Sequence, residues 1–148
     1  MAGLSACGGE SVGEQSDAGT GQVGASELSA PSDITLENLG GQWSLARISA
    51  TDEASRDVTG VDMDVDEATG GYIVENGCNN PRGTFDVTGG VLTSSPVMIT
   101  RMACLDNAVA ANEDAIVGVL SEITSATLSE EGQLQIVSQA GVLDFVRQ

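Results

Sequence analysis

Hydrophobic and polar residues alternate at every second position in several short stretches of the chain. In the clearest stretch, valine or methionine alternates with aspartate: Val61, Asp62, Met63, Asp64, Val65 and Asp66. Strict alternation is typical of a strand that has one face in the core and the other in water. Turn residues follow at 67–71, and an apolar run follows at 72–74. The pattern therefore predicts a hairpin.

Further strands are predicted on both sides of this hairpin. The first covers residues 42–49, with Trp43, Leu45 and Arg47 on one face. Turns rich in glycine or acidic residues separate the others, which we expect at residues 83–87, 91–93, 97–100, 125–128, 134–137 and 142–146.

One helix is predicted between these strands. Asp106 is a suitable N-cap, and apolar residues follow it at close to helical spacing, namely Val109, Ile116, Leu120 and Ile123. We expect Glu113 and Asp114 on the opposite side of the helix. The order of strands, one helix and more strands predicts the α+β class, with a small antiparallel, barrel-like β-sheet packed with one main α-helix.

The beginning of the chain lacks this patterning. Glycine, serine, alanine and acidic residues dominate residues 8–33, and the sizeable apolar side chains there are Val12, Val23 and Leu28. Such a segment buries too little apolar surface to offset the entropy lost on ordering. We therefore assign residues 1–33 to a lipobox remnant and a disordered acidic Gly/Ser-rich linker, and residues 34–148 to one folded domain.

Cys7 ends the run Leu4-Ser5-Ala6-Cys7, which resembles a bacterial lipobox. In a lipobox the cysteine receives a diacylglyceryl group and becomes the mature N-terminus. We expect lipidation of Cys7 and an extracytoplasmic location on the bacterial cell envelope, with the linker as tether. Residues 1–3 are too short for a signal peptide, so the signal is either missing from this sequence or trimmed. The alternative is a chance match of small and apolar residues.

The charge of the chain excludes several kinds of function. The sequence has 22 acidic residues, 5 basic residues and no histidine, which gives a formal net charge of −17. This charge repels phosphate backbones and anionic lipid headgroups, so we expect no nucleic-acid partner and membrane contact only through the lipid. Without histidine, neither the cysteines nor the serines have the usual general base. We therefore expect no enzymatic activity, no catalytic residues and no cofactor.

The spacing of Asp62, Asp64 and Asp66 matches the start of an EF-hand calcium loop. Such a loop requires glycine at its sixth position and a bidentate glutamate at its twelfth. The chain has Glu67 and Ile73 at these positions. We expect an amphipathic strand with its acidic face in water and no metal site; a weak, non-specific cation site is the alternative.

Two segments carry a family signature. A Gly-Cys-Asn turn before a short strand, and a Thr-x-Met-x-Cys run before the helix, resemble the META domain of the heat-shock protein HslJ. Residues 39–45 resemble the opening strand of that family, and residues 134–145 resemble its closing hairpin. The resemblance covers residues 36–147. The residues taken as the signature are Trp43, Gly77, Cys78, Asn79, Gly83, Thr100, Met102 and Cys104.

The resemblance implies a small antiparallel, barrel-like sheet packed on a helix, and a protein without catalytic residues. It also implies an extracytoplasmic, often lipid-anchored protein with a role in stress tolerance or surface integrity. We expect a non-enzymatic protein that binds another protein or a small apolar ligand. The alternative is a secreted inhibitor or adhesion module that acts on an extracellular protein. An exposed apolar groove would favour the first function, and a rigid, protruding loop at residues 79–82 would favour the second.

Cys78 and Cys104 are the two cysteines that remain if Cys7 carries lipid. An oxidising exterior pairs cysteines that come close to each other, so we expect a disulfide between them. Two separate buried thiols, each acting as a small hydrophobic side chain, are the alternative.

Overall fold

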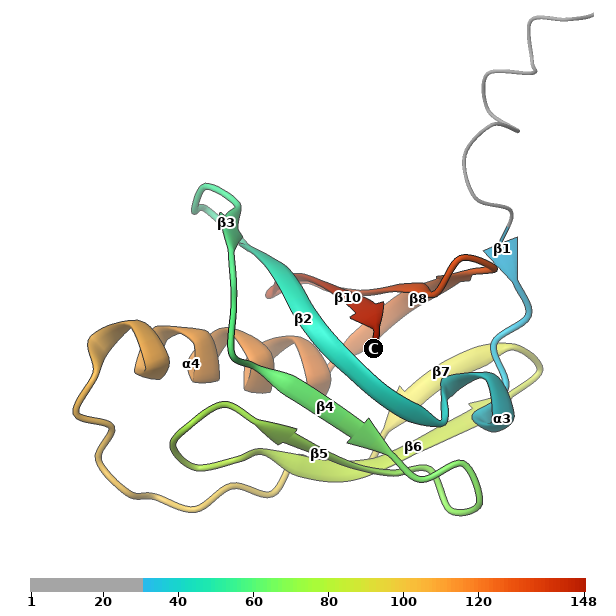
Figure 1. Cartoon of the computed structure of the whole chain (residues 1–148), viewed down its shortest axis with the longest axis horizontal. Helices are drawn as coiled ribbons and strands as arrows, with labels where there is room; N and C mark the ends of the chain where they lie inside the picture. Colours follow the sequence, from blue (N-terminus) through green and yellow to red (C-terminus); the bar gives the residue numbers. More distant parts are fainter. Residues whose placement is uncertain (1–30) are drawn as a thin grey trace, which may run out of the picture. The chain divides into compact units, whose positions relative to one another are not determined.

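The computed structural model describes residues 31–148, and most of these residues lie in antiparallel strands (Figure 1). The helices are α3 (Leu36–Leu39) and α4 (Asn107–Ser121). The strands are β1 (Pro31–Ser32), β2 (Gly41–Ala50), β3 (Arg56–Asp57), β4 (Asp62–Val65), β5 (Gly71–Glu75), β6 (Arg82–Thr88), β7 (Val91–Ser94), β8 (Ile123–Ser129), β9 (Gln133–Ser138) and β10 (Gly141–Arg147). Cys7 and most of the expected linker lie outside the described residues.

The strands form one curled sheet in the order β1-β8-β9-β10-β2-β4-β5-β6-β7, and β3 pairs with β2. β7, the last strand of this order, lies close to β8, the second strand from the other end, so the sheet is a nearly closed barrel. α4 packs against β2, β9 and β10 (Figure 1). This arrangement confirms the predicted antiparallel, barrel-like α+β fold. Neither helix in residues 31–148 is long and apolar enough to span a lipid bilayer.

The alternating stretch at residues 61–66 has the two faces that its pattern predicts. Val61, Met63 and Val65 are buried, and the three aspartates between them are exposed. β4 pairs with β5, whose Tyr72 and Val74 also point into the core. The predicted hairpin is therefore confirmed.

The prediction that Arg47 shares a face with Trp43 and Leu45 is wrong. In the pairing of β2 with β10, Arg47 lies opposite Asp144 and Leu45 lies opposite Phe145, so the residue between them has no partner. This bulge adds one residue to β2 and reverses the alternation after it. Ile48 is therefore the next buried residue, and Arg47 is exposed.

Two predicted element boundaries also differ from the structure. The strand expected at residues 97–100 is reduced to one isolated bridge between Met98 and Arg82. The preceding Pro96 has no N–H group to donate to a ladder. The helix ends at Ser121, so Ile123, expected within the helix, is the first residue of β8.

A candidate functional site around the Cys78–Cys104 disulfide

Three parts of the chain meet at one end of the barrel: the turn after β5, the segment between β7 and α4, and α4 itself. A disulfide between Cys78 and Cys104 joins the first two parts, with 5.9 Å between the Cα atoms. This distance lies within the usual range for a disulfide. The predicted pairing is confirmed, and it fixes the segment before α4 to the barrel.

Asn76 and Asn80 organise the turn that holds Cys78. The Asn76 side-chain oxygen accepts hydrogen bonds from the backbone N–H groups of Cys78 and Asn80, at 3.0 and 3.2 Å. The Asn80 side-chain oxygen accepts one in return from the Asn76 backbone, at 3.1 Å. Gly77 and Asn80 have φ of 89° and 50°, in the left-handed region that glycine and asparagine tolerate. Glycine at position 77 and asparagine at positions 76 and 80 therefore suit this turn.

The buried side chain of Asn79 connects all three parts of the site. Its Nδ2 donates to the Met102 carbonyl at 3.0 Å and to Glu113 Oε1 at 2.8 Å. Its Oδ1 accepts from the Thr100 hydroxyl and from the Met102 backbone N–H. Both ends of the amide are therefore satisfied, which an apolar residue of the same size cannot reproduce.

Glu113 lies on the buried face of α4, with 6% of its surface exposed, so its predicted place on the opposite side of the helix is wrong. Its Oε2 accepts from Asn76 Nδ2 and from the Asn79 backbone N–H, both at 2.9 Å. The reason for the burial is that the turn supplies the donors that a carboxylate needs. The sequence spacing indicates this position: Glu113 precedes Ile116 by three residues and Leu120 by seven, so the three residues share one face of the helix.

Burial raises the pKa of Glu113, but the hydrogen bonds from Asn76 and Asn79 outweigh burial and hold the pKa below its usual value. The two ion pairs within residues 31–148, Arg47–Asp57 and Arg56–Glu53, do not include this carboxylate. Its negative charge is therefore stabilised by amide N–H groups rather than by a cation.

A pocket of about 340 Å³ lies over the disulfide. We call it the disulfide pocket, and its lining residues are Gly77, Cys78, Met102, Ala103, Cys104, Leu105, Asp106 and Val109. Met102 is 61% exposed and Leu105 is 98% exposed. The disulfide thus fixes a segment whose large apolar side chains, Met102 and Leu105, are exposed rather than packed in the core.

The other two signature residues, Trp43 and Gly83, lie away from this site. Trp43 is fully buried, and its Nε1 donates to the Leu39 carbonyl at 2.8 Å. Gly83 packs closely against the side chain of Tyr72. A Cβ atom added to Gly83 would stand only 2.6 Å from the tyrosine hydroxyl oxygen, so a larger residue does not fit there. Burial raises the pKa of Tyr72, whose hydroxyl also bonds Ser94 at 2.8 Å. Trp43 and Gly83 therefore support packing.

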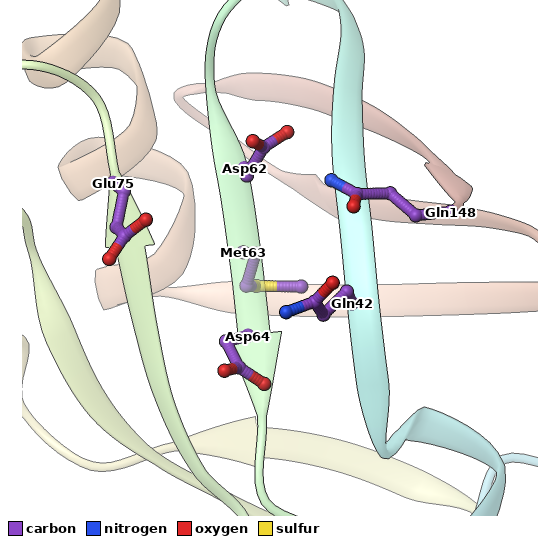
Figure 2. A pocket seen from close by; sticks show the side chains of 6 residues that line it. All are labelled: Gln42, Asp62, Met63, Asp64, Glu75 and Gln148. Carbon is purple, nitrogen blue, oxygen red and sulfur yellow. The ribbon is translucent and has the colours of Figure 1, made fainter.

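A second, acidic pocket of about 160 Å³ lies over β4 (Figure 2). Figure 2 shows the Asp62 and Asp64 side chains on β4, with that of Glu75 on the neighbouring strand. Asp66, the third aspartate of the pattern, instead accepts a hydrogen bond from the Ala68 backbone in the following turn. The three aspartates therefore do not converge on a common point.

Residues 79–82 do not form the protruding loop that would favour an inhibitor or adhesion module. Asn79 and Pro81 are buried, and Arg82 already belongs to β6. Two of the large apolar side chains that are exposed within residues 31–148, Met102 and Leu105, instead line the disulfide pocket.

Comparison with known proteins identifies the family and the fold. The profile described as META domain matches residues 34–148. A solved structure of a protein from Burkholderia xenovorans is 22% identical, with a TM-score of 0.62, and the match covers 80% of this chain and 92% of that one. A second solved protein is 19% identical, with a TM-score of 0.57, and the match covers 76% and 94% of the two chains. No curated protein sequence matches the chain.

Proposed function

The chain belongs to the META domain family, and from this premise we propose that it is a non-enzymatic extracytoplasmic protein that binds an apolar segment of a partner protein. A lipid on Cys7 holds it at the cell envelope, where it serves envelope integrity or the response to stress. The disulfide pocket is the binding surface, with Met102 and Leu105 at its rim.

The observation that carries this proposal is the exposure of Leu105 and Met102 beside the pocket. Full burial of a leucine or methionine side chain gains about 1.5–3 kcal/mol, so a partner that covers both gains a useful part of a binding energy. Methionine adapts its shape to different apolar surfaces. The disulfide and Asn79 hold the segment in place before binding, which reduces the entropy lost in the complex.

The charge of the chain supports a partner with basic residues around its apolar anchor. A net charge of −17 attracts such a partner and accelerates its association at low salt. We expect the rate of association to fall as salt is added, because exposed charges are screened. The apolar contact at the pocket depends less on salt.

Two features support the extracytoplasmic location. The Cys78–Cys104 disulfide is typical of proteins in oxidising compartments. The run that ends at Cys7 resembles a lipobox. Mass spectrometry of the protein from its native envelope should find a diacylglyceryl adduct on Cys7, and Cys7→Ser should release the protein into the soluble fraction. An unmodified peptide across residues 1–10 would contradict the anchor.

A photoreactive residue at position 105 tests the binding surface in intact cells. We expect cross-linked partners from position 105 that do not form from position 91, because Val91 is also apolar and 61% exposed but lies on β7, away from the pocket. Met102→Ser should lower the yield from position 105, and Val91→Ser should leave it unchanged. The same products from both positions, or none from position 105, would exclude the pocket as the binding surface.

A further inference from the structure

Three potential metal ligands converge below the disulfide pocket. The Sγ atoms of Cys78 and Cys104 and a carboxylate oxygen of Glu113 all lie within 4.8 Å of one another. Within residues 31–148, no other set of three cysteine, aspartate or glutamate side chains meets this distance. Oε1 of Glu113 is the oxygen near the sulfur, 3.8 Å from Cys104 Sγ. A disulfide sulfur has no hydrogen to donate, so this contact is not a hydrogen bond.

The two oxygens of Glu113 differ in how many donors they have. Oε2 accepts two hydrogen bonds, from Asn76 Nδ2 and the Asn79 backbone. Oε1 accepts one, from Asn79 Nδ2, and no other N–H or O–H group of the described residues is bonded to it. A carboxylate oxygen has two acceptor positions. The buried oxygen with spare capacity is thus the one that faces the sulfurs.

We propose that reduction of the disulfide converts this cluster into a binding site for a divalent cation of the Zn²⁺ class, with Cys78, Cys104 and Glu113 as ligands. A dithiol reductant supplies two electrons and two protons, so the protein S–S bond breaks, two cysteine thiols form and the reductant becomes a disulfide. The cation then displaces both thiol protons to water and binds two thiolates and Oε1. Zn²⁺ accepts this mixture of sulfur and oxygen ligands.

The geometry requires little rearrangement. Zinc bonds sulfur at about 2.3 Å and carboxylate oxygen at about 2.0–2.2 Å, so a tetrahedral site separates ligand atoms by roughly 3.5–3.8 Å. The distance from Cys104 Sγ to Glu113 Oε1 is already 3.8 Å. The two sulfurs must move apart once their bond is broken, and the Cα atoms at 5.9 Å leave room for the side chains to rotate.

The net charge of the metal-bound site would equal that of the oxidised site. The oxidised site carries one negative charge, that of Glu113, because disulfide sulfurs are neutral. Two thiolates and one carboxylate carry three negative charges, and a divalent cation returns the total to one. The amide donors of Asn76 and Asn79 therefore face the same net charge in the oxidised and the metal-bound state.

The fourth ligand would come from solvent. Both cysteines line the disulfide pocket, so a water molecule has access from that side. Three protein ligands with a water molecule in the fourth position would make an open zinc site, unlike the closed four-ligand sites that serve structure.

The test uses the full chain with Cys7→Ser, which leaves the two cysteines of the site. The protein is reduced with dithiothreitol, freed of reductant without oxygen, and titrated first with Co²⁺ and then with Zn²⁺. We expect one Co²⁺ per chain, with thiolate-to-metal absorption in the near ultraviolet and the visible bands of tetrahedral Co²⁺, all removed by Zn²⁺. The oxidised protein should show none of these bands. If the reduced protein shows no thiolate absorption, the proposal is wrong.

Glu113→Gln and the exposed Asp114→Asn are a matched pair, since both remove one negative charge from α4. We expect Glu113→Gln to weaken Zn²⁺ binding by roughly 100-fold, at least as much as the loss of an outer-shell partner, and Asp114→Asn to leave it unchanged. Equal affinity in both variants would overturn the role of Glu113. If Glu113→Gln does not fold, an infrared measurement on the protein that retains Glu113 replaces it. Zn²⁺ should shift a glutamate carboxylate band in the difference spectrum of protein labelled with ¹³C-glutamate. An unshifted spectrum would overturn the proposal.

Discussion

The guanidinium carbon of Arg147 lies 4.2 Å from the ring centre of Trp43, so a side chain of β10 covers the largest residue of the core. The same guanidinium donates to the backbone carbonyls of Gly40 and Asn38, at the end of α3. One exposed arginine therefore connects the end of the last strand, the short helix and the buried indole. Lysine has no planar group that could make these contacts together.

Arg147→Ala should lower the free energy of unfolding by about 1–2 kcal/mol, through loss of the cation–π contact and of the bonds to the α3 carbonyls. The fluorescence of Trp43, the one tryptophan of the sequence, should shift to longer wavelength as water reaches the ring. The control is Arg47→Ala, which removes an exposed ion pair with Asp57 and should cost about 0.5 kcal/mol or less. Equal losses in urea unfolding would contradict the role of the indole contact.

Glu113→Gln should destabilise the protein at neutral pH by about 1–3 kcal/mol. A glutamine has one oxygen in place of two, so its NH₂ group faces an N–H donor of Asn76 or Asn79 and leaves that donor unsatisfied.

The same substitution should also change the pH dependence of stability. The pKa of Glu113 is lowered by folding, so its ionisation stabilises the fold above the unfolded pKa of about 4.3, and this stabilisation is lost as the pH falls through the folded pKa. The difference in stability between the wild type and Glu113→Gln should therefore shrink in urea unfolding from pH 7 to pH 3. For the exposed control Asp114→Asn we expect a small difference at every pH. A gap for Glu113→Gln that is constant with pH would refute the assignment.

Asn79→Asp should destabilise more than Asn79→Ala, although aspartate has the same shape as asparagine. The new carboxylate oxygen would replace the N–H donor that lies 2.8 Å from Glu113 Oε1, and it would also face the Met102 carbonyl. We expect a loss of about 3 kcal/mol or more at pH 7. Because two close carboxyl groups favour sharing one proton, stability should recover as the pH falls towards 5. Thermal unfolding of both variants at pH 7 and pH 5 checks this reversal.

Reduction of the Cys78–Cys104 disulfide should lower the free energy of unfolding by about 3.5 kcal/mol, as the chain-entropy relation gives for a loop of this length. Cys78 and Cys104 are 26 residues apart in the sequence. The measurement compares guanidinium unfolding of the Cys7→Ser protein with and without reductant and in the absence of metal. The double variant Cys78→Ser, Cys104→Ser should have the same free energy of unfolding as the reduced protein, and adding reductant should not change it. Identical midpoints for the oxidised and reduced protein would show that the bond adds no stability.

The sheet could be predicted from the sequence because period-two patterning acts locally. At residues 61–66, alternation alone placed each side chain on its observed face. The same rule failed at Arg47 because the bulge that reverses the alternation is set by pairing with β10, about one hundred residues away in the chain. No local pattern contains that information.

Only part of the candidate site could be predicted, because some of its contacts also join segments that are far apart in the sequence. The cysteine pair and Asn79 were found through the family signature, but the role of Asn76 and the burial of Glu113 were not. Glu113 was assigned by polarity to the outer side of α4, although its spacing from Ile116 matches the apolar face. A buried carboxylate is stable only where donors meet it, and those donors come from a turn more than thirty residues earlier.

The pairing of β2 with β10 has a consequence for biosynthesis. β2 carries Trp43 and Ile48, yet one of its edges is completed by residues 141–147. A chain that emerges from the ribosome or a secretion channel with its N-terminus first cannot close the barrel before β10 is released. Such distant pairing slows folding, because the entropy of a long loop is lost before the contacts form. Until then β2 presents apolar residues and an open edge to the translocation and quality-control machinery. The interval before β10 emerges is therefore when this protein depends most on protection from aggregation and proteolysis.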